Sequence, residues 1–243
     1  MKSIVLRFSV VAAMLCLMFA ACKKAEVSAT ATDPELTFAL IPDNPVVTFA
    51  ATQAGGVALT SIAPSKQAFS WYAGTGNITR FRLNAKRGGL AAEYSSGSLS
   101  NINLFSLNSL LSTISIPKGD YTDVRATVIF SQVTAPPYPI VLLGTYTTGS
   151  GTNIPVEFDL NDNLEINVNI ANIIADGSKD FTANIAMHLN MFLNSVSPSE
   201  IDNTTRTTNG SILISKTINT TLYNKIKGNM LACSGATLAN KPK

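Results

Sequence analysis

The sequence predicts a mainly β fold, an antiparallel β-sandwich with a short C-terminal helix. Apolar and polar residues alternate with period two in several short segments between residues 36 and 195. Clusters of Gly, Pro, Asn and Ser separate these segments, as turns between strands require. Helix signals come late, after residue 196. Many short strands followed by one helical pattern are typical of a sandwich with a helical appendix.

Residues 1–21 have the features of an export signal. Lys2 and Arg7 supply a positive start, and the run from Phe8 to Ala21 is apolar apart from Ser9. That run is shorter than the about 20 residues that a membrane-spanning helix needs. It ends in small residues, as a signal-peptide cleavage site requires.

The stretch Met18-Phe19-Ala20-Ala21-Cys22 resembles the bacterial lipobox, in which small residues precede an obligatory cysteine. The resemblance implies lipidation at Cys22, with fatty acids such as palmitate, after removal of the preceding peptide. It implies a cell-envelope lipoprotein that meets the membrane through its lipid anchor. The alternative is an ordinary signal peptide that carries a cysteine. Lys23 stands where an aspartate would resemble an inner-membrane retention signal. We therefore expect the protein on the outer membrane, on either its periplasmic or its surface face.

Residues 22–35 are small and polar with no apolar period, which predicts the lipidated cysteine and a flexible tether. We expect the β domain, with its helical appendix, over 36–232 and a disordered tail over 233–243. Removing residues 1–21 takes away two basic residues, so the net charge falls from +3 to +1. A nearly neutral chain lacks the basic footprint of a nucleic-acid partner. Cys233 remains as a single unlipidated cysteine, so no internal disulfide is expected.

Alternation assigns faces to the predicted strands. Phe81, Leu83 and Ala85 share one face of the segment 78–86, opposite a basic face. The segment 121–130 turns Val124, Ala126, Val128 and Phe130 inward. Two further inward rows are Val156, Phe158 and Leu160, and Leu164, Ile166, Val168 and Ile170. Their segments, 156–160 and 164–170, flank Asn161-Asp162-Asn163 and predict a β-hairpin. The longest alternating row comprises Phe181, Ala183, Ile185, Met187, Leu189, Met191 and Leu193.

Two helix signals follow the strands. Ser197-Pro198-Ser199-Glu200 matches a capping box with proline at the first helical position. Leu222, Ile226 and Met230 share one helical face over 220–231, although Gly228 weakens that helix.

The segment Ile114 to Tyr121 contains an apolar residue followed by Pro-x-Gly-x-Tyr and an alternating strand. This looks like the entry to a strand in immunoglobulin- or prealbumin-like sandwiches, where the tyrosine hydroxyl ties the corner to nearby backbone. The stretch from Trp71 to Val196 resembles an uncharacterised bacterial lipoprotein domain with a prealbumin-like or carboxypeptidase-regulatory-like sandwich. Ile154-Pro155-Val156 and the long closing strand carry the rest of the resemblance. It implies a fold and brings no catalytic residues.

Residues for catalysis are sparse. His188 is the single histidine, and its strand neighbours Asn184, Ala186 and Asn190 supply no carboxylate to orient it. No Gly-x-Ser-x-Gly elbow occurs. We therefore expect no enzyme, no catalytic residue, no cofactor and no metal site. Asp159, Asn161, Asp162, Asn163 and Glu165 form an oxygen-rich cluster, but Leu164 and Ile170 replace the glycine and glutamate of a calcium loop.

Glu157 and Asp159 share a strand face, a pairing found both in glycosidases and on ordinary solvated strands. Four basic residues, Arg80, Arg82, Lys86 and Arg87, are expected on a solvated outer face; the alternative is contact with an acidic glycan or partner. The aromatics Trp71, Tyr72 and Tyr138 are the candidate ligand-binding residues, because rings in stiff loops stack on sugars or anchor partners; core packing is the alternative.

The function expected from these features is a binding module for a glycan or an envelope protein. The alternative is a structural or adhesin subunit similar to fimbrillins, assembling through sheet edges.

Overall fold

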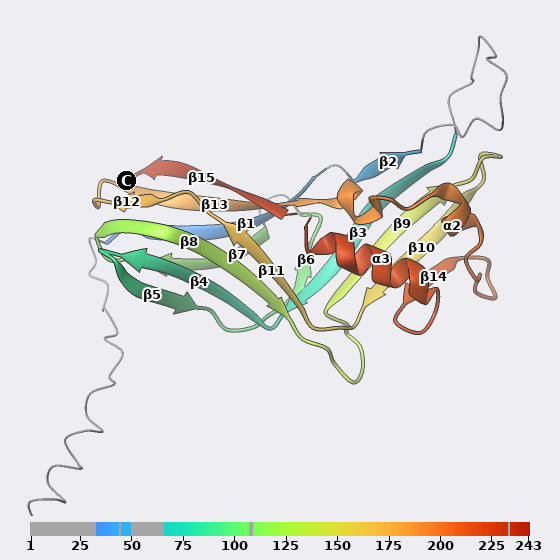
Figure 1. Cartoon of the computed structure of the whole chain (residues 1–243), viewed down its shortest axis with the longest axis horizontal. Coiled ribbons are helices and arrows are strands. Elements are labelled where there is room, and N and C mark those ends of the chain that lie inside the picture. The colour runs from blue at the N-terminus through green and yellow to red at the C-terminus, as the bar shows by residue number, and fades with distance from the viewer. Residues whose placement is uncertain (1–32, 44, 50–65, 107–108, 233) are drawn as a thin grey trace, which may run out of the picture.

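The computed structural model describes residues 33–43, 45–49, 66–106, 109–232 and 234–243. The described chain is mainly β, with three sheets and three short helical segments (Figure 1). The prediction of a mainly β fold is therefore confirmed, but the sheets are not purely antiparallel, since two of the described strand pairs are parallel. The predicted helix after residue 219 is present, and a further strand follows it. Cys22 and the predicted signal peptide lie outside the described residues, as does Cys233.

The first sheet, sheet A, joins the two ends of the described chain. Its strand order is β15-β13-β1-β7, with β1 parallel to β13 and antiparallel to β7. The C-terminal strand β15 runs antiparallel along the outer side of β13. The strands are β1 (Glu35–Asp43), β7 (Ser109–Ser115), β13 (Lys179–His188) and β15 (Ser234–Pro242).

The second sheet, sheet C, faces sheet A. Its strand order is β11-β8-β4-β5, and β12 pairs with the start of β8. Phe38 from sheet A meets Phe81 from sheet C with ring centroids 4.4 Å apart, so the two inner faces pack directly. The strands are β4 (Arg80–Arg87), β5 (Leu90–Ser95), β8 (Gly119–Phe130), β11 (Leu164–Asn169) and β12 (Ile173–Ala175).

The third sheet, sheet B, lies at the other end of the molecule with the helices on one face (Figure 1). Tyr223 of the longest helix stacks on Phe158 with centroids 5.6 Å apart. The strands are β2 (Val46–Thr48), β3 (Ala68–Ile78), β6 (Leu99–Asn103), β9 (Ile140–Thr147), β10 (Asn153–Leu160) and β14 (Ile212–Ser215). The helical segments are η1 (Leu189–Leu193), α2 (Pro198–Asp202) and α3 (Thr220–Met230).

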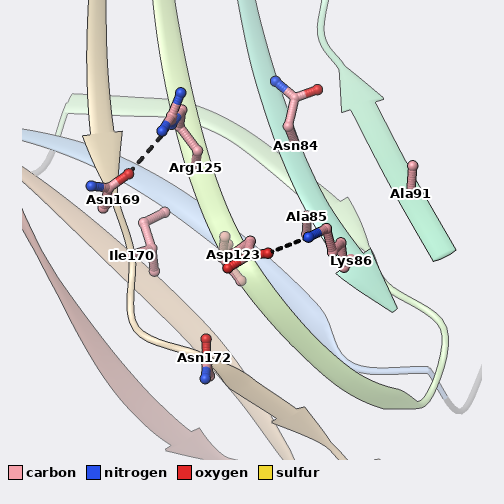
Figure 2. Close-up of a pocket in the computed structure, with 10 residues that line it drawn as sticks. Asn84, Ala85, Lys86, Ala91, Asp123, Arg125, Asn169, Ile170 and Asn172 are labelled. Atoms are coloured by element: carbon pink, nitrogen blue, oxygen red, sulfur yellow. Dashed lines mark hydrogen bonds and ion pairs between the residues drawn. The ribbon is translucent and has the colours of Figure 1, made fainter. Parts of the chain in front are cut away.

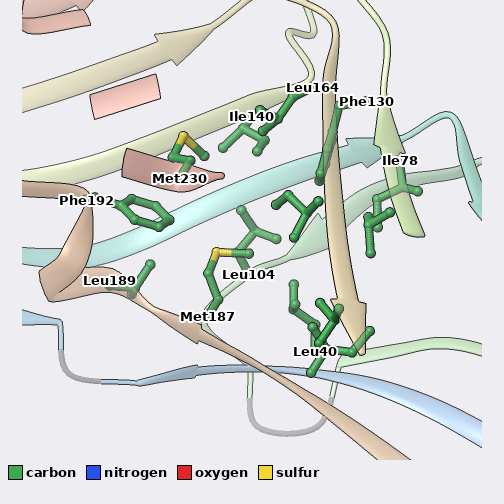
Figure 3. Close-up of a cluster of buried hydrophobic side chains, with 14 of the residues drawn as sticks. Leu40, Ile78, Leu104, Phe130, Ile140, Leu164, Met187, Leu189, Phe192 and Met230 are labelled. Atoms are coloured by element: carbon green, nitrogen blue, oxygen red, sulfur yellow. The ribbon is translucent and has the colours of Figure 1, made fainter. Parts of the chain in front are cut away.

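One apolar core runs through both ends of the molecule. Thr79 alone separates β3 of sheet B from β4 of sheet C. Leu40 and Met187 from sheet A, Ile140 from sheet B and Met230 from α3 belong to one continuous cluster (Figure 3). Since burial of apolar surface is the main favourable term in folding, this shared core holds the three sheets together.

The local face assignments are confirmed. All the predicted inward residues of β4, β8, β10 and β11 are buried. The capping box is present, with the Ser197 hydroxyl accepting from the Glu200 amide and the Glu200 carboxylate accepting from the Ser197 amide. In α3, Leu222, Ile226 and Met230 are buried as predicted.

The corner before β8 also forms as predicted. The Tyr121 hydroxyl donates a hydrogen bond of 2.7 Å to the backbone carbonyl of Pro117. Burial raises the pKa of Tyr121 well above its usual range, and the hydrogen bond with the Tyr94 hydroxyl raises it further. The hydroxyl therefore stays protonated and remains a donor over the whole physiological pH range.

The predicted hairpin around Asn161-Asp162-Asn163 is wrong. β10 pairs with β9 and β14 in sheet B, whereas β11 pairs with β8 in sheet C. The turn is therefore a crossing between sheets. The Asn161 side chain accepts from the Val133 amide and donates to the Val133 carbonyl, and the Asn163 side chain accepts from the Gln132 amide. These bonds to the loop after β8 replace the pairing that a hairpin would make.

Two further predictions are corrected near the ends of the domain. The row of 181–193 stops being a strand after His188, and Met191 in the 3₁₀ helix is exposed while Phe192 is buried. The expected disordered tail is a strand, because residues 234–242 pair with β13 and place Ala236 and Leu238 against the core. The expected tether also ends earlier, since Asp33 is already buried and β1 begins at Glu35.

Candidate functional site

The candidate site is an open groove on the outer face of sheet C, with a volume of about 750 Å³ (Figure 2). Polar side chains from β4, β8, the end of β11 and the segment after it surround the groove, and the apolar residues beneath them are buried in the core apart from Ala91. The lining comprises Asn84, Ala85, Lys86, Ala91, Asp123, Val124, Arg125, Asn169, Ile170 and Asn172. The volume lies within the range of about 300–1,000 Å³ that is usual for small-molecule sites.

A bulge in β8 shapes the groove. Thr122 pairs with Lys86 and Arg125 pairs with Asn84, so two residues of β8 stand opposite Ala85 alone. Asp123, the first of the two, has a φ of 51°, a left-handed conformation that is uncommon for a residue with a side chain. Bulges redirect side chains. Here the bulge leaves the Asp123 carboxylate beside the ammonium group of Lys86.

Lys86 and Asp123 form an ion pair at 2.8 Å across the groove. The hydrogen bond from Lys86 lowers the pKa of Asp123, and the same bond raises the pKa of Lys86. Both groups are exposed, so water screens the pair and it adds little to folding stability. Its main effect is local, because it neutralises one positive and one negative charge inside the groove.

Arg125 lies in the middle of the groove between two asparagines. It pairs in register with Asn84 on one side and Asn169 on the other. Its Nε donates to the Asn169 side-chain oxygen at 3.3 Å (Figure 2). Among the described residues, the amides of Asn84 and Asn172 make no side-chain hydrogen bond, so both remain available to a ligand.

The predicted basic face forms, with one change. Arg80 and Lys86 are exposed, while Arg82 and Arg87 are half-buried. Arg87 lies over Gly119 at the corner, and Arg80 and Arg82 lie outside the groove lining. Lys86 is therefore the one member of this set that lines the groove. The sequence analysis did not identify Arg125, Asn84, Asn169 and Asn172; the only signal was an Asn or Arg at an outward position of three strands that are separate in the chain and adjacent in sheet C.

The three candidate aromatic residues do not form a site together. Trp71 is 1% exposed and packs on Phe69 and Phe158, so its core interpretation is correct. Tyr72 is 56% exposed on β3. Tyr138 is half-buried in the loop before β9, where its carbonyl accepts from the Asn77 side chain. Tyr72 and Asn77 are five positions apart along β3, roughly 16 Å between their backbones.

His188 has a carboxylate partner, contrary to the prediction. Its Nδ1 lies 2.7 Å from one oxygen of Asp43 and 2.8 Å from the other. The parallel pairing of β1 with β13 places the two residues side by side. Hydrolysis through this pair would also need a nucleophile. Among the described residues no hydroxyl or thiol hydrogen-bonds the ring of His188.

The acidic pair on β10 has a different environment. Burial raises the pKa of Asp159 to about 6, and the charge of Glu157 adds to the effect. One carboxylate oxygen of Asp159 is buried without a hydrogen-bond partner. Neighbouring positions in the sheet are Val141 on β9 and Ser215 on β14. The Asp159 carboxyl therefore binds a proton at mildly acidic pH.

The three turn residues of the oxygen-rich cluster, Asn161, Asp162 and Asn163, are used in structural contacts. Asp162 accepts from Lys216 and Lys227 at 2.7 Å each and from the Tyr223 hydroxyl at 2.9 Å. Burial alone would raise the pKa of Asp162, but these three donors outweigh it and hold the pKa at about 2. Within the described ranges no group of three or more His, Cys, Asp or Glu side chains is placed to hold a metal ion.

Comparison with known proteins identifies no relative. No family model, no curated protein and no solved structure matches this chain. Among residues 33–243 as described, no helix has the length and apolar character needed to cross a membrane.

Proposed function

We propose that this chain is a non-enzymatic cell-envelope lipoprotein whose β domain binds a glycan in the groove on sheet C. The observation that carries the proposal is the lining of that groove, in which three asparagine amides, an arginine and an internal ion pair face one open cavity. Amides and charged groups donate and accept hydrogen bonds in several directions, which suits the many hydroxyls of a saccharide.

A glycan fits this groove better than an envelope protein does. Protein interfaces depend on large aromatic or aliphatic anchors in well-packed pockets. The aliphatic lining here is limited to Ala85, Ala91, Val124 and Ile170. Ala85, Val124 and Ile170 are at most 7% exposed, so the groups that a ligand can reach are mainly the polar ones, which suit the hydroxyls of a sugar.

The finer fold assignment belongs to the same proposal. We assign the domain to the prealbumin-like sandwiches on the Pro-x-Gly-x-Tyr corner, and the bond from Tyr121 to Pro117 supports this. Sheets A and C supply the two facing layers, and sheet B with α3 extends them.

The lipid anchor is proposed from the sequence of residues 18–22. A chain anchored at Cys22 would have eleven positions, 22–32, before the first described residue of the domain. At about 3.3–3.6 Å per extended residue, this segment would reach roughly 35–40 Å from the membrane. We place the protein on the outer membrane on the basis of Lys23.

A saccharide panel tests the binding function. Calorimetric titration of the mature chain in detergent with neutral and acidic oligosaccharides should reveal a saturable ligand. Asn84→Ala and Asn172→Ala should each weaken binding at least fivefold, because each removes a free groove amide. Asn224→Ala, an exposed asparagine on α3, is the matched control and should leave affinity unchanged. Equal loss in all three variants, or no binding by the parent chain, would contradict the proposal.

The alternative, a subunit similar to fimbrillins that assembles through sheet edges, has one favourable observation. β7 lies at the edge of sheet A, carries no charged residue or proline, and has Leu110 60% exposed. However, its pairing with β1 contains a register shift near Phe38, and such bulges protect edges from further pairing. Light scattering over a wide concentration range separates the two functions, since only the subunit would polymerise.

A further inference from the structure

We infer that the ligand of the groove carries a single carboxylate, which Arg125 binds through the two terminal nitrogens of its guanidinium. This inference rests on the proposed glycan-binding function and specifies the ligand class as an acidic saccharide containing hexuronate-type units. Three features of the groove favour such a ligand: the way Arg125 is held, the charges around it and the two free amides beside it.

Arg125 is oriented but not neutralised. Asn169 accepts from its Nε, which leaves four of the five guanidinium N–H donors for other partners. Within the described part of the chain, Arg125 forms no salt bridge with a carboxylate. A guanidinium fixed at Nε and open at its terminal nitrogens matches the two oxygens of a carboxylate in a bidentate pair.

The remaining charges of the groove cancel one another. Lys86 and Asp123 pair at 2.8 Å, so neither is a free counter-charge. The groove lining therefore has one uncompensated positive charge, that of Arg125. A ligand group with one negative charge balances it, whereas a doubly charged phosphate would leave an excess charge close to the Asp123 carboxylate.

The free amides account for the rest of the ligand. Asn84 stands beside Arg125 on β4, and Asn172 follows β11 on the opposite side of the groove. Hydroxyl groups on either side of a bound carboxylate can hydrogen-bond these two amides. A sugar acid presents a carboxylate and hydroxyls on one ring, which is the combination that the groove lining fits.

Oligosaccharides and their methyl esters test the inference, because esterification removes the charge and keeps the sugar and its linkage. Tetramers of galacturonate and of glucuronate, each with its ester, are titrated into the mature chain in detergent. At least one acid should bind at least tenfold more tightly than its ester. Arg125→Gln should abolish that preference while changing affinity for the ester less than twofold. Arg125→Lys should lose most of it, since lysine lacks the planar fork.

Arg80→Gln is the matched control, because Arg80 is exposed on the same sheet face outside the groove lining. It should leave the preference intact, and circular dichroism should give every variant the parent's melting temperature within a few degrees. Equal binding of acid and ester by the parent, or an unchanged preference in Arg125→Gln, overturns the carboxylate inference. If esters then still bind and Asn84→Ala weakens them, the glycan proposal stands alone. If no acid and no ester binds, both fall.

Discussion

Replacing Tyr121 by phenylalanine isolates the hydrogen bond at the corner before β8. The ring is 1% exposed and keeps its packing in the variant, whereas the 2.7 Å bond to the Pro117 carbonyl is lost. A hydrogen bond contributes about 0.5–1.5 kcal/mol net, and a buried acceptor left without a donor adds to the loss. Pro117 is itself buried, so we expect the free energy of unfolding to fall by about 1.5 kcal/mol.

Urea denaturation measures this loss. With a slope of about 2 kcal/mol per molar urea, the midpoint should fall by about 0.7 M at constant slope. Tyr94→Phe is the matched control, because it removes only the 3.4 Å contact between the two hydroxyls and Tyr94 is half-buried. Tyr94→Phe should lower the free energy of unfolding by less than about 0.5 kcal/mol. A Tyr121→Phe midpoint equal to that of the control would refute the proposed role of the corner.

Four further substitutions test other parts of the molecule. Asp162→Asn should lower the free energy of unfolding at pH 7 by about 2 kcal/mol, as measured by urea midpoints. The reason is that the pKa of Asp162 in the folded chain, about 2, lies below its value in the unfolded chain. The parent should lose the same stability as the pH falls from 4 to 2. Asp159→Asn should stabilise the domain at pH 7 by about 1–2 kcal/mol. The raised pKa of Asp159 makes the parent less stable as the pH rises from 4 to 6, and the variant lacks this effect. Equal free energies of unfolding for parent and variant over this pH range would contradict the prediction. His188→Gln should lower the free energy of unfolding by less than about 1 kcal/mol and leave envelope phenotypes intact, because both side chains of the contact with Asp43 are more than a third exposed; a folded variant that behaves like a deletion would argue for an enzyme. Cys22→Ala should abolish fatty-acid labelling of the chain, and undiminished label would rule out the proposed lipidation site.

Local patterns predicted the parts of the fold that local physics determines. Alternation identified the buried faces of β4, β8, β10 and β11, because side chains on a strand point to opposite sides in turn. The capping box marked the start of α2, and the spacing of Leu222, Ile226 and Met230 marked the buried face of α3. The motif before β8 predicted a hydroxyl contact that the structure contains.

Long-range pairing could not be predicted in the same way. Nothing local distinguishes a tight turn at Asn161-Asp162-Asn163 from a crossing between sheets, because the same amides stabilise either. The pair of Asp43 and His188 joins residues 145 positions apart through a parallel pairing that periodicity does not reveal. The groove was missed for the same reason: Asn84, Arg125 and Asn169 come from three strands and become neighbours only in sheet C.

The order of strands in sheet A has a consequence for how the chain matures. β1 occupies the middle of that sheet, yet its partner β13 is flanked on the other side by β15, whose last residue is Pro242. Lys243 then binds the carbonyl of Asp33, so the last residue touches the first described one. Contacts of such long sequence separation form slowly and only when both segments are present. A chain delivered from its N-terminus thus keeps one side of β13 unpaired until residues 234–242 arrive, and a truncation that removes them would leave that side open to pairing with another molecule.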